Sequence, residues 1–161
     1  MKYKQKPLYL LMVLALLAGL LGFQPAQPVQ AASQALRISQ AYGGGGNSGA
    51  TYTNDFIEIF NSSNTAIDLE GWSVQYASKS GTSWQVTLLT GIIPANGYYL
   101  IQEAAGSGGT VSLPTPDDTG SIAMSGTDFK VALVHSTTDL DGTSCPTGVV
   151  DFLGVGSANC Y

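Results

Sequence analysis

The chain has 161 residues, of which 11 are acidic and 6 are basic, for a formal net charge of −5. So few cations argue against direct nucleic-acid binding, because duplex DNA is held mainly by Lys and Arg side chains that neutralise phosphates. The length allows one domain with its own hydrophobic core.

The first 31 residues have the pattern of an export signal. Three lysines stand among residues 2–6, residues 8–21 are almost all apolar, and Val29-Gln30-Ala31 places small side chains where signal peptidase reads them. A membrane anchor is the alternative, but a spanning helix needs roughly 20 apolar residues. We therefore predict cleavage after Ala31, which leaves a secreted domain, residues 32–161, without a membrane segment.

Removal of the three N-terminal lysines takes the formal charge from −5 to −8. The fixed cations that remain are Arg37, Lys79 and Lys130. Three scattered cations make no basic face, so we expect little direct nucleic-acid binding by the mature chain.

The rest of the chain consists of short β-like runs separated by turn residues, and helical periodicity is almost absent. We predict strands at Leu36–Ala41, Asp55–Phe60, Ala66–Leu69, Trp72–Tyr76, Ser83–Leu89, Tyr98–Glu103, Ser121–Met124, Phe129–His135 and Val149–Leu153. Eight or nine short strands at this spacing indicate an all-β fold, an antiparallel β-sandwich. The longest loop is Ala104–Gly120, where Pro114 and Pro116 argue against a strand.

Apolar alternation predicts which strands are central. Phe56–Phe60 and Val131–Val134 are apolar on both faces, which is typical of central strands. In Trp72–Tyr76 and Trp84–Leu88 every second residue is apolar, so we predict that these residues face the core. The alternate residues are expected in water: Ser73, Gln75, Gln85 and Thr87.

The glycine-rich stretch Tyr42–Ala50 raises the question of a phosphate-binding loop. Such a loop needs a Lys and a Ser or Thr after its glycines, followed by a helix. Here no Lys follows, and the next element is the predicted strand Asp55–Phe60. We interpret the stretch as a flexible connection in which glycine permits positive φ.

Several motifs in fixed order resemble the lamin tail domain family, specifically its bacterial exported branch. They are "NDFIEIFN" at 54–61, "IDLEGWSVQY" at 67–76, "PANGYYLI" at 94–101, "FKVALV" at 129–134 and "VVDFLG" at 149–154, and the similarity covers roughly residues 35–161. The resemblance implies an immunoglobulin-like β-sandwich without catalytic machinery. It also marks motif positions with structural roles: Asp55, Glu58, Asn61, Leu69, Gly71, Trp72, Gly97 and Tyr98.

The two cysteines, Cys145 and Cys160, lie close together near the end of the chain. In an exported domain we predict that they form a disulfide. A metal site with two Cys ligands is the alternative, and it would need further ligands nearby.

No catalytic residue and no cofactor are predicted. His135 is the single histidine and ends a predicted strand, and no G-x-S-x-G motif is present. Asp139 and Asp141 resemble a fragment of a calcium loop, but the distal Glu is missing, so they are weak calcium candidates. Glu58 lies inside an apolar strand, where a carboxylate needs hydrogen-bond donors, and we expect a structural role.

Aromatic side chains could form a platform for sugars or bases, but most alternate as core residues do. We predict that they are buried or half-buried: Tyr42, Tyr52, Trp72, Tyr76, Trp84, Tyr98 and Tyr99.

The sequence thus favours a non-catalytic secreted module that positions or tethers a downstream catalytic domain, or binds a cell-surface or extracellular component. The alternative is the N-terminal part of a secreted nuclease of the endonuclease/exonuclease/phosphatase type, as the resemblance implies, and the end one residue past Cys160 is what an incomplete protein would show. A third hypothesis is that the chain is a stand-alone envelope or adhesion protein.

Overall fold

The computed structural model describes residues 35–161. The predicted signal peptide, residues 1–31, lies outside the described residues. The described part holds the strands β1 (Leu36–Tyr42), β2 (Asn54–Asn61), β3 (Ile67–Asp68), β4 (Ser73–Ser78), β5 (Gln85–Leu88), β6 (Ile92–Ile93), β7 (Tyr98–Ala105), β8 (Asp118–Thr119), β9 (Phe129–Val134) and β10 (Asp151–Val155).

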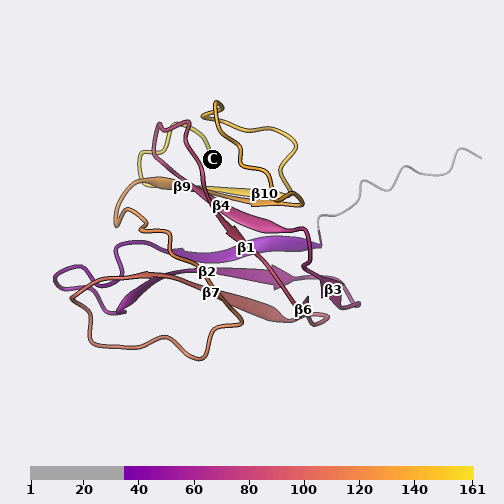
Figure 1. The fold of residues 1–161 in the computed structure, drawn as a ribbon, viewed down its shortest axis with the longest axis horizontal. Helices are drawn as coiled ribbons and strands as arrows, with labels where there is room; N and C mark the ends of the chain where they lie inside the picture. The colour runs from indigo at the N-terminus through magenta and orange to yellow at the C-terminus, as the bar shows by residue number, and fades with distance from the viewer. Residues whose placement is uncertain (1–34) are drawn as a thin grey trace, which may run out of the picture. The chain divides into compact units, whose positions relative to one another are not determined.

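Two four-stranded sheets, ordered β1-β2-β7-β8 and β10-β9-β4-β5, form the two layers of a sandwich (Figure 1). A two-stranded sheet of β3 and β6 lies beside them. All pairings between strands are antiparallel except that of β7 with β8. The predicted all-β sandwich is confirmed.

The core lies between the two sheets. Inward side chains of β2, such as Ile57 and Ile59, meet those of β9, such as Val131 and Leu133, and all four are 0% exposed. Burial of an aliphatic side chain of this size contributes about 2 kcal/mol to stability. The predicted central strands are central: β2 lies between β1 and β7, and β9 lies between β10 and β4.

The outer face of the β10-β9-β4-β5 sheet is covered by the segment 135–148, and we call it the covered face. Ser73 and Gln75 lie on this face and are 0% exposed, so the prediction that they face water is wrong. Gln75 Nε2 donates to Thr138 O at 2.9 Å, and Gln75 Oε1 accepts from Leu140 N at 3.0 Å. The Gln75 amide therefore satisfies a backbone C=O and a backbone N–H of segment 135–148, as a neighbouring strand would do.

The prediction that the apolar residues of Trp84–Leu88 face the core between the sheets is wrong. Thr87 pairs with the inward-facing Val74 and is buried, whereas Leu88 is 52% exposed. Trp84 is buried in a second apolar cluster on the covered face. Its other members and packing neighbours are Ala77, Ala132, Val134, Leu140, Val149 and Phe152.

Lys130 is fully buried on the covered face, at the edge of that second cluster. Its ammonium donates to Gly81 O at 2.9 Å, Ser144 O at 2.6 Å and Asn159 Oδ1 at 3.1 Å. Three acceptors match the three N–H donors of a lysine, and the Trp84 ring lies 5.4 Å from the nitrogen. Burial lowers the pKa of Lys130.

Three predicted features of the strand list differ from the structure. Ser121–Met124 is not a strand, although Ile122 and Met124 are buried, because side-chain carboxylates accept its N–H groups. The short strands β6 and β8 were not predicted. Strand β8 lies within the Ala104–Gly120 loop but begins after both prolines, so it keeps its backbone donors.

The glycine-rich stretch is packed rather than loose, which corrects the interpretation as a flexible connection. Gly44, Gly46 and Gly49 have positive φ, as expected. Gly44, Gly45 and Gly46 are buried, and a Cβ at Gly45 or Gly46 would collide with the backbone of Asn54 or Gly106. The glycines thus allow three stretches of backbone to pack closely at this end of the sandwich.

Candidate functional site

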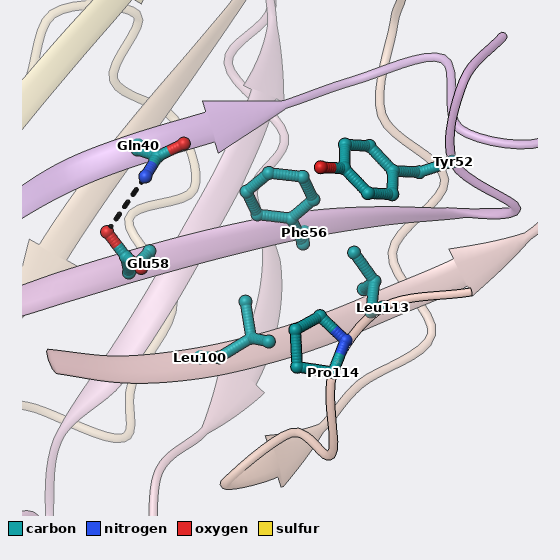
Figure 2. A pocket seen from close by; sticks show the side chains of 7 residues that line it. All are labelled: Gln40, Tyr52, Phe56, Glu58, Leu100, Leu113 and Pro114. Atoms are coloured by element: carbon teal, nitrogen blue, oxygen red, sulfur yellow. Dashed lines mark hydrogen bonds between the residues drawn. The ribbon is translucent and has the colours of Figure 1, made fainter. Parts of the chain in front are cut away.

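The outer face of β1, β2 and β7 carries a shallow hollow of about 210 Å³. Alternation along these strands points one set of side chains away from the core, and the register brings Gln40, Glu58 and Leu100 into one row across the sheet. We call this surface the open face. The residues that line the hollow are Gln40, Tyr52, Phe56, Glu58, Leu100, Leu113 and Pro114 (Figure 2).

Phe56 forms the floor of the hollow at one end and is held by two tyrosines. The Tyr42 ring stacks on it with centroids 5.4 Å apart and an interplanar angle of 9°. The Tyr52 ring meets it edge-on at 5.6 Å and 89°. Mutual packing of three rings fixes their rotamers, so this apolar wall has its shape before any ligand arrives.

A polar pair stands at the other end of the hollow. Glu58 Oε1 accepts from Ser39 Oγ at 2.6 Å and from Gln40 Nε2 at 3.1 Å (Figure 2). These bonds supply the donors that the expected structural role of Glu58 needs. Glu58 is only partly buried. Within the described residues neither its Oε2 nor Gln40 Oε1 accepts a hydrogen bond, so both oxygens are free acceptors beside the hollow.

The third wall, Leu113 and Pro114, comes from the long loop after β7. Thr51 O accepts from Val111 N at 3.0 Å, before the wall. After the wall, Leu100 O accepts from Asp117 N at 2.9 Å. The loop is thus tied to the connection between β1 and β2 before the wall and to β7 after it, and it is a fixed wall.

A second aromatic patch lies farther along the open face. The rings of Phe60 and Tyr98 are 4.7 Å apart, and the Arg37 guanidinium lies 5.6 Å from the Phe60 centroid. Tyr98 is 60% exposed. The prediction that it would be buried or half-buried is therefore wrong, because the register places it on the outer face and gives the core its neighbour Tyr99.

Two buried carboxylates are occupied by backbone and hydroxyl donors. Asp55 accepts from Gly45 N and Met124 N, each at 2.6 Å. Glu103 accepts from Thr87 Oγ1 at 2.6 Å and Ile122 N at 2.9 Å. Burial raises the pKa of both groups despite these donors. All four carboxylate oxygens therefore accept hydrogen bonds that hold the fold together.

The remaining motif positions lie at turns and in the core. Leu69 is fully buried, and Gly71 has φ of +81°. The Trp72 ring stacks on His135, which follows β9 and is exposed. At Gly97 a Cβ would crowd Pro94.

Asn61 is the most heavily bonded of these motif positions. Its side chain donates to Thr65 O at 2.8 Å and Pro94 O at 3.0 Å and accepts from Ser63 N at 3.0 Å. The Asn61 amide, at the end of β2, thus fixes both the turn that follows β2 and the turn that begins at Pro94.

The two cysteines form the predicted disulfide, with Cα atoms 5.8 Å apart. The weak calcium candidates, Asp139 and Asp141, lie in the segment 135–148 that covers the β10-β9-β4-β5 sheet. Asp141 Oδ1 accepts the N–H of Trp84 and so ties the covering segment to β5. Among residues 35–161 no group of three or more His, Cys, Asp or Glu side chains is placed to hold a metal ion.

Sequence reasoning singled out Glu58, Tyr52 and Tyr98 but missed most of the hollow. Gln40, Leu100 and Pro114 are ordinary residues in their own segments, and they meet only through strand pairing and loop closure. The signal that could have found Gln40 is its position in an edge strand opposite a carboxylate, once the register is known.

Two packed, mainly antiparallel sheets define an immunoglobulin-like β-sandwich. The sequence matches the Lamin Tail Domain family over residues 29–147, most of the chain, and the chain belongs to that family. The match ends before β10 and Cys160, so it is shorter at this end than the expected similarity to residue 161. No curated protein matches the chain. In residues 35–161 no helix is long and apolar enough to cross a membrane.

Proposed function

We propose that the chain is a non-catalytic module of an exported protein, and that it tethers its parent protein to an extracellular or cell-surface component. The observation that carries the proposal is the open face, which has a hollow with fixed walls and two free acceptor oxygens. Within residues 35–161 no segment lies over this face in the way that segment 135–148 lies over the covered face. Fixed, partly apolar concave sites with a few placed polar groups are typical of ligand binding.

A tethering role agrees with the way in which the domain uses its ionisable groups. Asp55 and Glu103 are consumed by structural hydrogen bonds. His135 is stacked on Trp72. The chain is a lamin tail domain, an immunoglobulin-like module. A binding role is compatible with structural roles for Asp55, Glu103 and His135.

Export is supported by the disulfide, because such bonds persist in oxidising compartments and are rare in reducing ones. The predicted cleavable signal at residues 1–31 points the same way. We propose that the domain acts outside the cell, next to a downstream catalytic domain. From the sequence resemblance, a nuclease of the endonuclease/exonuclease/phosphatase type is the candidate, and the reading frame beyond codon 161 tests that point.

Nucleic acid is not the proposed ligand. Residues 32–161 carry a formal charge of −8, and one of the three cations, Lys130, is buried. Any DNA binding would rest on few phosphate contacts and should vanish by about 0.2 M salt. A submicromolar Kd that survives such salt would contradict the proposal.

The test is sedimentation of the purified protein with washed cell-envelope material from its host, alongside hydrolysis assays on DNA, RNA, ester and peptide substrates. We expect saturable retention and no turnover. Absence of retention overturns the tethering role. Turnover that a single substitution within residues 35–161 abolishes would overturn the non-catalytic assignment.

A further inference from the structure

We propose that the hollow on the open face binds one ring of a neutral polysaccharide, and that the saccharide chain continues along the sheet to the Phe60–Tyr98 patch. The inference rests on the proposed function and names the ligand class of the same face.

The chemistry of the two ends of the hollow fits a sugar ring. A pyranose presents C–H groups on its faces and hydroxyls around its rim. Leu100 and Pro114 supply apolar surface for the C–H face, above the floor formed by Phe56, which is 8% exposed. Glu58 Oε2 and Gln40 Oε1 supply two adjacent acceptors for neighbouring hydroxyls, and the Gln40 amide keeps one N–H to donate in return.

The acceptors are oriented in advance. Ser39 Oγ and Gln40 Nε2 both donate to Glu58 Oε1, so the carboxylate of this lining residue cannot rotate without losing two bonds. A fixed pair of acceptors reads the spacing of two hydroxyls at little entropic cost.

Size and charge argue against nucleotides, phosphates and acidic sugars as ligands of the hollow. A volume of about 210 Å³ is below the roughly 300 Å³ at which pockets for whole cofactors begin, so the hollow takes one ring rather than a nucleotide. The lining holds one carboxylate and no cation, which disfavours phosphates and acidic sugars.

The second patch explains why the ligand is a chain. Phe56 and Phe60 are four residues apart on the same face of β2, which is roughly 13 Å along a strand. A ligand seated in the hollow and extended by a few rings would therefore reach Tyr98, whose side chain is 60% exposed. Stacking there should add affinity to long saccharides but not to short ones.

Isothermal titration and ¹⁵N-resolved NMR of the purified protein test the proposal with cellohexaose, chitohexaose and maltohexaose, and with the matching disaccharides. We expect at least one hexasaccharide to bind, with shifts in β1, β2 and β7, and about tenfold more tightly than its disaccharide. If none binds at roughly 5 mM, several times the ~1 mM Kd that corresponds to −4.1 kcal/mol, the proposal is overturned.

Substitutions locate the site. Leu100→Ser and Glu58→Gln, both in the lining of the hollow, should each weaken hexasaccharide binding about tenfold, with an unchanged fold by NMR. Leu88→Ser is the matched control, because Leu88 is 52% exposed on the other sheet, and it should leave binding unchanged. Tyr98→Ala should weaken the hexasaccharide severalfold and leave the disaccharide unaffected. Binding that is insensitive to both Leu100→Ser and Glu58→Gln contradicts the assignment.

Octalysine and a single-stranded oligonucleotide are the competing probes. If octalysine alone binds in the hollow, the site recognises cationic peptides and the saccharide proposal is wrong; binding of the oligonucleotide alone overturns it in the same way. The hexasaccharide is then used to elute the protein from envelope material. Retention without elution overturns this inference but keeps the tethering role, whereas loss of retention itself overturns both.

Discussion

The two outer faces of the sandwich are formed by similar alternating strands, but only one of them is covered by a segment from elsewhere in the chain. On the covered face, segment 135–148 lies over β4 and β9, and Lys130, Gln75 and Trp84 bind it there. On the open face, comparable polar and aromatic residues, such as Glu58 and Phe60, remain partly accessible. The difference shows that a strand's polar face becomes structural or ligand-accessible according to whether a distant loop supplies partners for it.

The largest expected effect is the loss of the buried lysine on the covered face. Lys130→Met leaves Gly81 O, Ser144 O and Asn159 Oδ1 without their donor, so we expect about 4 kcal/mol less stability in urea denaturation. Lys79→Met is the control at an exposed lysine and should change stability by less than about 0.5 kcal/mol. Equal effects of the two substitutions would mean that the covering segment does not depend on the ammonium.

The disulfide closes the same face. Replacement of both cysteines, Cys145→Ser with Cys160→Ser, releases a loop with a sequence separation of 15, for which the chain-entropy model gives about 3 kcal/mol. We expect a lower Tm with the domain still folded at room temperature, because the main core lies between the sheets and not under the bridge. Unfolding of the double variant at 25 °C would show that the covered face is essential to the sandwich.

Much of the fold could be predicted from local sequence, because the central strands β2 and β9 are apolar runs bounded by turn residues. The covered face could not. Ser73 and Gln75 alternate with core residues in the way that solvent-facing residues do, and the partners that bury them lie 63 residues or more away.

The hollow was predictable only in part for the same reason. Glu58 stood out as a carboxylate in an apolar strand, but its neighbour Leu100 is brought beside it by the β2–β7 register. Pro114 arrives through a loop whose closure depends on backbone hydrogen bonds. Residue type alone carries no information on either contact.

The pH dependence of stability separates the interior carboxylates from a surface one. Burial raises the folded-state pKa of Asp55 and Glu103 above their unfolded values of 3.8 and 4.5. Their contribution is therefore largest below these values and is lost as pH rises through the folded pKa, so stability should increase as pH falls from 7 toward about 4.5. Glu103→Gln should flatten this rise in denaturation curves measured across that range.

At lower pH the pH dependence of stability is set by a surface carboxylate, Asp128. Hydrogen bonds from Ser157 lower the pKa of Asp128 to about 2. Its contribution is present above the unfolded value and is lost as pH falls from about 4 through 2, so stability should decline again in that window. Asp128→Asn should reduce the decline, and a stability curve without a maximum near pH 4–5 would contradict both assignments.

The smallest effect is expected at the exposed end of the open face, where two adjacent tyrosines give a direct contrast. Tyr99 is 4% exposed, and its hydroxyl donates to Thr90 O at 2.6 Å, whereas Tyr98 is 60% exposed and its ring packs on Phe60 across the outer surface of the sheet. Tyr98→Ser should therefore lower the free energy of unfolding by less than about 1 kcal/mol, since it removes one cross-strand contact and opens no cavity. Tyr99→Ser, the same chemical change one residue later, should cost about 3 kcal/mol or more because it empties a site in the core. Urea denaturation of the two variants measures the contrast. If Tyr98→Ser proves as costly as Tyr99→Ser, the open face is held by its aromatic residues in the same structural way as the covered face, and its exposed tyrosine is not free to serve a ligand.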